Sequence, residues 1–282
     1  MPLPDLLIAC SSGYDQSTLR FWVNSARASG FAGKIAVIVL NGSRETTRWL
    51  TAQGVEVAAA DLDPATGNPR LVSAVPVHVE RFFYIWRFLD SVKGKYGRVI
   101  TTDIRDVVFQ SNPSTWLDTG LAHHDLCVSG EGIRFRDESW NDGNLGGAFP
   151  GVLHTMLRDR EVYNVGAIAG TAEAVTAACL VNYLCSVSRP IPIADQAAFN
   201  VLLHNDLLPG RIRRLRADED FACHAGVNAD PAKLDRFLPA LMTPLPRFEN
   251  GRVLTATGAP YCIVHQYDRV PAWRAHFEQI FG

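Results

Sequence analysis

The sequence predicts an α/β protein with a Rossmann-like sheet that is mixed, mostly parallel and flanked by helices. Strand-like apolar runs alternate with helical stretches over the first third of the chain, an order that implies parallel strands and right-handed crossovers. Hydrophobic residues make up 47% of the 282 residues and charged residues 20%, a balance that supplies a sizeable core. No repeat, low-complexity tract or linker interrupts the sequence, so we expect one domain over 1–282 with a C-terminal elaboration.

The first predicted strands are short apolar runs at 6–10, 34–42 and 55–63. The helix predicted between the first two, 15–30, repeats apolar residues at helical spacing and ends at a glycine. The next helix, 43–54, opens on a serine that can cap its N-terminus. This βαβαβ order is typical of the start of a nucleotide-binding sheet.

The middle of the chain contains a predicted loop at 64–77 and a strongly apolar helix at 78–97, which should pack against the sheet. Residues 131–150 are polar, aromatic and Gly-rich, which favours a long active-site loop over a core element. The later elements are, in order, a strand at 163–170, a helix at 171–188, a helix that begins at Asp195 within 193–205, and a strand at 211–216. An apolar strand running into a polar turn at 261–271 and a closing amphipathic helix follow.

Composition argues against several classes of function and location. A net charge of −2 gives no basic surface for nucleic acid. Six scattered cysteines lack paired metal spacing and argue against a disulfide framework. The opening stretch MPLPDLLIAC lacks the basic and long apolar regions of a signal peptide, and no run approaches the roughly 18 apolar residues of a spanning helix. We therefore expect a cytoplasmic protein, with peripheral membrane contact left open.

The stretch RVITTDIRDVVFQSNP (98–113) places carboxylates inside apolar sequence. Residues 99–100 are typical of a buried strand, and 107–109 of its continuation or of a short second strand. Asp103 and Asp106 lie between them, where charge costs free energy unless something neutralises it.

Two interpretations of these carboxylates remain open at this point. Open α/β sheets bind ligands at the carboxyl ends of their strands, where two carboxylates can hold a divalent cation against a pyrophosphate. Alternatively Asp103 caps a turn, and Asp106 pairs with Arg105 or with a remote arginine.

Several stretches, in order along most of the chain, resemble nucleotide-sugar-dependent glycosyltransferases of the GT-A fold. Within that fold the resemblance is to the retaining family 8 galactosyl- and glucosyltransferases, related to glycogenin and to lipopolysaccharide galactosyltransferases. IACSSGY corresponds to the first strand and nucleotide-contacting turn, and RVITTDIRDVVF to the D-x-D metal strand. YNVGAIAG corresponds to the N-x-G sugar strand, and ADQAAFN to the D-Q element. HQYDRVPAW matches the frame H-x-x-G-x-x-K-P-W.

The resemblance implies a metal site. It assigns Asp106 as a ligand, because the DVVF context matches the second Asp of D-x-D. Asp103 is displaced by one residue from the first Asp and binds either the metal or the ribose hydroxyls. His265 would add an imidazole, and its alternative is a packed strand-end histidine. A mixed oxygen and nitrogen site of this kind suits Mn²⁺, with Mg²⁺ as the second choice.

The resemblance also implies a donor site for a nucleotide-diphosphate sugar, with a UDP-sugar as the first choice. Its nucleotide contacts would come from Ala9, Ser11, Tyr14 and Ile104. Ser11 stands where the family often has an Asp that contacts uracil, which weakens the case for uridine. Arg81 would reach the diphosphate, or else cover the helix surface.

The transferred sugar would face Asn164 and Gly166, where glycine permits close backbone approach or is simply a strand glycine. Asp195 and Gln196 would lie beneath the anomeric carbon. The structural alternative for Asp195 is the N-cap of the following helix.

The final frame departs from the family at Asp268 and Pro271, so the lysine that holds the departing phosphate is missing. Arg269 is the expected replacement. The 131–150 loop would admit the acceptor, with Glu131, Trp140 and Asn144 as candidate sugar contacts. A tryptophan there could equally pin the loop to the body.

The resulting hypothesis is metal-dependent transfer of a sugar to a hydroxyl acceptor, with retention of anomeric configuration. Residues 1–110 would form the nucleotide-binding half and 111–282 the sugar and acceptor half. The alternatives are an inverting transferase with Asp195 as general base, a sugar-nucleotide nucleotidylyltransferase and a non-catalytic binding module. The nucleotidylyltransferase ranks low because SSGYDQSTLR has one glycine and no lysine.

Overall fold

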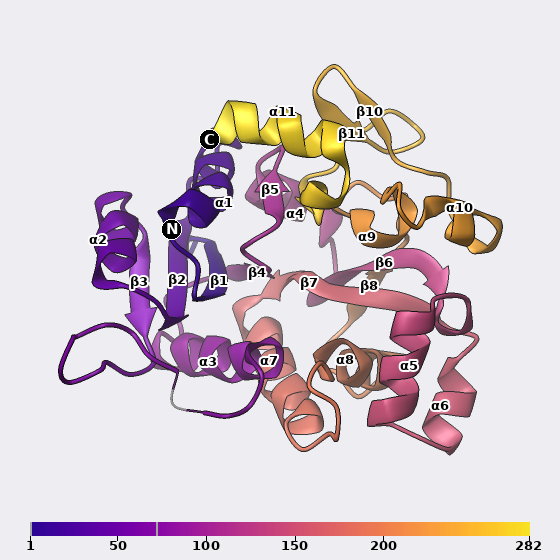
Figure 1. The fold of residues 1–282 in the computed structure, drawn as a ribbon, viewed down its shortest axis with the longest axis horizontal. Helices are drawn as coiled ribbons and strands as arrows, with labels where there is room; N and C mark the ends of the chain where they lie inside the picture. Colours follow the sequence, from indigo (N-terminus) through magenta and orange to yellow (C-terminus); the bar gives the residue numbers. More distant parts are fainter. Residues whose placement is uncertain (1, 72) are drawn as a thin grey trace.

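The computed structural model of the protein describes residues 2–71 and 73–282. Its centre is a seven-stranded sheet in the order β3-β2-β1-β4-β7-β6-β8 (Figure 1). β7 runs antiparallel to its neighbours β4 and β6, and the other pairs are parallel. The strands are β1 (Leu6–Ser12), β2 (Lys34–Asn41), β3 (Glu56–Ala59), β4 (Arg98–Thr102), β6 (Leu126–Arg134), β7 (Glu161–Thr171) and β8 (Ile212–Leu215). The predicted mixed, mostly parallel sheet is therefore confirmed.

Helices cover both faces of this sheet (Figure 1). Side chains alternate along a strand, so Leu7 and Ala9 of β1 face α1 (Gln16–Ala28), whereas Leu6 and Ile8 face α3 (Val77–Ser91). β1 is consequently buried on both faces. The other helices are α2 (Arg44–Ala52), α4 (Pro113–Gly120), α5 (Ser139–Ala148), α6 (Val152–Leu157), α7 (Ala172–Ser186), α8 (Asp195–His204), α9 (Ala225–Asn228), α10 (Leu234–Phe237) and α11 (Pro271–Phe281). Within the described residues, none is both long and apolar enough to cross a bilayer.

A small sheet in the order β5-β12-β9 packs beside α1. It consists of β5 (Val107–Phe109), β12 (Ile263–His265) and β9 (Ala222–His224). β12 runs antiparallel to β5 and parallel to β9. Residues 107–109 thus form a second strand instead of continuing β4. A separate hairpin pairs β10 (Arg247–Glu249) with β11 (Arg252–Leu254).

Two predicted elements are wrong in extent or type. The helix predicted over 78–97 ends at Ser91. The loop predicted over 131–150 is instead the end of β6, a 3₁₀ turn and α5. The Glu138 carboxylate accepts the backbone N–H groups of Trp140 and Asn141 at 3.3 and 2.7 Å, which starts α5 despite its glycines.

Glu161, at the start of β7, is a partly buried carboxyl whose Oε1 accepts the Gly132 N–H at 3.2 Å. Burial raises the pKa of Glu161 to about 7, and the Gly132 bond only partly opposes that shift. Between the ordinary pKa of 4.5 and about 7 the folded chain holds a proton that the unfolded chain has lost. The protein therefore loses stability as pH rises through this window.

Replacing this carboxyl by its amide removes the buried charge and keeps an acceptor for Gly132. We expect Glu161→Gln to raise the free energy of unfolding at pH 8 by about 2–3 kcal/mol, and the gain to vanish near pH 4. Urea unfolding at both pH values measures the difference, with exposed Glu249→Gln as the control. An equal gain at both pH values would contradict the charge argument.

Candidate functional site

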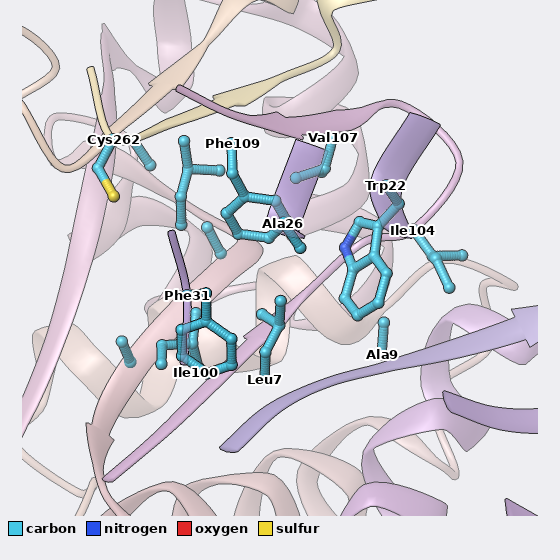
Figure 2. Close-up of a cluster of buried hydrophobic side chains, with 14 of the residues drawn as sticks. Leu7, Ala9, Trp22, Ala26, Phe31, Ile100, Ile104, Val107, Phe109 and Cys262 are labelled. Atoms are coloured by element: carbon cyan, nitrogen blue, oxygen red, sulfur yellow. The ribbon is translucent and has the colours of Figure 1, made fainter. Parts of the chain in front are cut away.

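The segment between β4 and β5 is fixed by apolar anchors that alternate with polar residues. Ile104 and Val107 pack into the same core cluster as Trp22 (Figure 2). The Trp22 indole N–H also donates to Thr102 Oγ1 at 2.9 Å, inside the protein. Because this backbone is held by the core, the charged residues between the anchors project from a defined position.

Those charged residues face a cavity of about 440 Å³ at the carboxyl ends of the sheet strands. Most of the sequence-predicted site residues line this cavity, including Glu131 and Trp140 of the 131–150 segment. The full set of predicted residues on the cavity wall is Tyr14, Arg81, Asp103, Ile104, Asp106, Glu131, Trp140, Asn164, Gly166, Asp195, Gln196, His265 and Arg269.

Three predicted contacts lie outside the cavity wall. Ala9 and Ser11 are fully buried, and the β1 residues that line the cavity are Cys10 and Ser12. The strand was predicted in the right place, but alternation along it turns the other side chains to the cavity. Asn144, on α5, also does not line it.

Asp103, Asp106 and His265 converge on one point of the cavity. One ligand atom from each lies within 4.8 Å of the others. His265 Nε2 lies 3.2 Å from Asp103 Oδ2 and 3.8 Å from Asp106 Oδ1. The approach follows from strand pairing, since His265 is in register with Val107, the residue after Asp106. This arrangement confirms the predicted meeting of the distant side chains.

A second histidine orients the first. In the parallel pairing of β12 and β9, His224 lies beside His265, and their Nδ1 atoms are 3.0 Å apart. One of these atoms must donate the bond, and when His265 donates, its Nε2 presents a lone pair to the two carboxylates. Burial lowers the pKa of His265, although Asp106 opposes the shift, which favours the neutral imidazole that binds metals. The donor set fits Mn²⁺ or Mg²⁺. Nothing in the sequence near His224 signalled this role.

Gly166 is explained by the same histidine. A Cβ atom there would overlap the His265 ring, lying 2.7 Å from Nδ1, and would also lie 2.8 Å from Asn164 Oδ1. The Gly166 carbonyl accepts the Asp103 N–H at 2.9 Å, which ties β7 to the end of β4. The glycine thus permits the imidazole to approach the backbone.

Two arginines neutralise the carboxylates. Arg81 contacts Asp103 and lies 3.1 Å from Asp195 Oδ2, so this guanidinium joins the predicted metal and sugar ends of the cavity. Arg105 donates to Asp106 Oδ2 at 2.7 Å and to Asp268 Oδ2 at 2.8 Å. The pairing of Asp106 with Arg105, one of the alternatives raised by the sequence, is therefore present beside the three-ligand cluster.

Another part of the cavity wall is a network of amides around Glu131. Asn164 Nδ2 and Gln196 Nε2 donate to its Oε1 at 2.7 and 3.0 Å, and Asn141 Nδ2 donates to its Oε2 at 3.1 Å. Sequence reasoning missed Asn141, because its segment was expected to be a loop. Asp195 is the first residue of α8 and Ala194 is the N-cap, so the capping alternative for Asp195 is wrong.

Comparison with known proteins shows that this chain resembles a solved structure in its fold. Neither the models of known protein families nor the sequences of curated proteins give a match. Among solved structures, the chain is similar to the apo structure of the WbbM bifunctional glycosyltransferase, with a TM-score of 0.54 and 12% identity. The match covers 100% of this chain and 52% of the other, so this chain spans about half of that structure's length. The chain therefore has a glycosyltransferase-type Rossmann-like fold.

Gly166→Ala should displace the His265 ring from the two carboxylates. We expect Mn²⁺ affinity, measured by isothermal titration calorimetry, to fall at least tenfold. The free energy of unfolding should fall by about 1–3 kcal/mol, as in other overpacked interiors. Gly143→Ala is the matched control, because a Cβ there meets no atom within 4 Å. Wild-type Mn²⁺ affinity in Gly166→Ala would contradict this account of the site.

Proposed function

We propose that this protein transfers a sugar from a nucleotide-diphosphate sugar to a hydroxyl-bearing acceptor, using a divalent metal and retaining the anomeric configuration. The observation that carries the proposal is the Asp103, Asp106 and His265 cluster, placed on the cavity of a glycosyltransferase-type fold. A UDP-sugar is the first-choice donor. A glycan, a lipopolysaccharide or capsule precursor, or a small molecule would be the acceptor.

The three-ligand cluster would hold Mn²⁺ or Mg²⁺ beside the donor's diphosphate. When bound, the cation supplies positive charge that offsets the charge of the departing nucleoside diphosphate. Arg269, exposed on the cavity rim, would bind the same diphosphate. Tyr14 and Ile104 would contact the nucleoside.

Elsewhere on the cavity wall, Asn164, Gln196 and Asp195 would orient the sugar. Asp195 Oδ1 is buried and accepts no hydrogen bond from the described residues, so it can accept one from a sugar hydroxyl. Trp140 is 50% exposed at the cavity edge and offers a flat apolar face to an acceptor sugar. In this arrangement 1–110 binds the nucleotide, and 111–282 binds the sugar and the acceptor.

A thermal-shift panel of nucleotide sugars with and without Mn²⁺ tests the metal and donor together. A ligand present at 100 times its Kd stabilises the folded state by about 2.7 kcal/mol. We expect this shift with Mn²⁺ present, and its loss in Asp106→Asn and His265→Ala. Exposed Asp235→Asn on α10 should behave as wild type. A metal-independent shift, or one that survives both ligand variants, would refute the site. Product NMR reports retention or inversion.

Arg269→Ala tests the replacement of the family lysine. We expect Mn²⁺-dependent donor hydrolysis to slow at least tenfold, because the departing diphosphate loses a charge-assisted hydrogen bond. Mn²⁺ affinity should stay unchanged, since the arginine is not a ligand. Arg274→Ala, on α11 and outside the cavity wall, is the control. Unchanged turnover in Arg269→Ala would rule out this role.

A further inference from the structure

Besides the metal cluster and Glu138, whose carboxylate caps α5, two buried carboxylates line the cavity, and their surroundings differ. Asp195 is paired with Arg81 at 3.1 Å. Glu131 is 4% exposed and has no Lys, Arg or His nitrogen within 4.0 Å in the described part of the chain. Its hydrogen-bond partners are neutral side-chain amides. Glu131 is therefore a buried carboxyl that forms no ion pair with the described residues.

The hydrogen bonds around Glu131 fix the direction of the amides. Asn164 Oδ1 accepts the Gly166 N–H at 2.6 Å, so the Asn164 amide group must point its N–H to Glu131. Gln196 Nε2 donates to Asn141 Oδ1 at 2.8 Å as well as to Glu131. Burial raises the pKa of Glu131, and the hydrogen bonds from Asn164 and Gln196 oppose that shift because these donors need an ionised acceptor. Oε1 accepts two bonds and Oε2 one, which leaves a lone pair on Oε2.

Glu131 also lies near the proposed metal cluster. Asn164 connects the two, because its amide nitrogen bonds Glu131 while its oxygen bonds Gly166, the residue against which the His265 ring packs. A donor whose diphosphate sits at the cluster would therefore place its sugar near Glu131.

We propose that Glu131 is the catalytic anion that faces the anomeric carbon, whereas Asp195 and the amides bind sugar hydroxyls. This inference rests on the proposed function. As the bond to the diphosphate stretches, positive charge develops on the anomeric carbon and the ring oxygen. An anion held in place by fixed dipoles, without a cation of its own, gains more from that charge than one already paired with arginine.

Glu131→Gln removes the charge and keeps the shape. We expect kcat for Mn²⁺-dependent hydrolysis of UDP-glucose and UDP-galactose to fall at least 100-fold, with the Kd values of UDP and Mn²⁺ within threefold of wild type. Glu161→Gln, a carboxyl outside the cavity wall, is the matched control and should keep wild-type kcat. A Glu131→Gln kcat within tenfold of wild type would overturn the proposal.

Chemical rescue separates charge from packing, including the case in which Glu131→Gln loses UDP binding. Formate should restore Glu131→Ala hydrolysis at least tenfold, whereas formamide, its neutral counterpart, should not. Equal rescue by both compounds, or rescue by neither, would show that the charge is not what matters. If the wild-type protein shows no Mn²⁺-dependent binding or hydrolysis of a nucleotide sugar, the proposed function itself fails, a result distinct from these.

Discussion

The pairing of β12 with β5 is the constraint on which the candidate site depends. Each strand has three residues, and their antiparallel register puts His265 opposite Val107. The imidazole reaches Asp106 only because this register holds. Buried side chains on both strands, including Val108 and Val264, pack with the C-terminal helix and fix the register from the far side. The last part of the chain therefore serves the site through packing as well as through one ligand.

Arginines complete this site, because its carboxylates lie too close together to share a buried cavity without positive charge. Arg81 bridges Asp103 and Asp195, and Arg105 bridges Asp106 and Asp268. Each guanidinium keeps two carboxylates in place with fixed directions, which a lysine ammonium would do less well. Glu131, which lines the same cavity, instead accepts hydrogen bonds from neutral amides and forms no ion pair with the described residues.

The sequence could predict which side chains meet, because parallel strands place their carboxyl ends at one edge of a sheet. That rule, with the motif order, was enough for Asp103 and Asp106. Asn164 lies near the start of the antiparallel strand β7, so its prediction rested on the motif alone. It could not give the phase of alternation along β1, which turns Ser11 away from the cavity. Pairings such as Arg81 with Asp195 depend on how α3 and α8 pack, which no local pattern records.

The prediction of a loop over 131–150 was wrong for a different reason. Its glycines and polar residues are typical of a loop, yet Gly132, at φ 71°, lies within β6, where the pairing with β7 shifts register between Gly130 and Arg134. The helix that follows depends on one capping carboxylate, Glu138, rather than on propensity. Composition therefore described the chemistry of the segment correctly and its conformation wrongly.

The departures from the family frame after His265 have local physical reasons. Asp268 accepts a hydrogen bond from Arg105, which also binds Asp106. A glycine at position 268 could not accept this bond. Pro271 occupies the first turn of α11, where its missing N–H needs no partner. Gln266, at φ 61°, is held in a left-handed conformation by its bonds to Asp106 and Gly226. A lysine at position 271 would forgo this helix start. The cationic residue nearest to that position in the sequence is Arg269, whose Nε lies 3.7 Å from Asp268 Oδ1. That separation exceeds a hydrogen bond, which leaves the guanidinium on the cavity rim able to bind an anion.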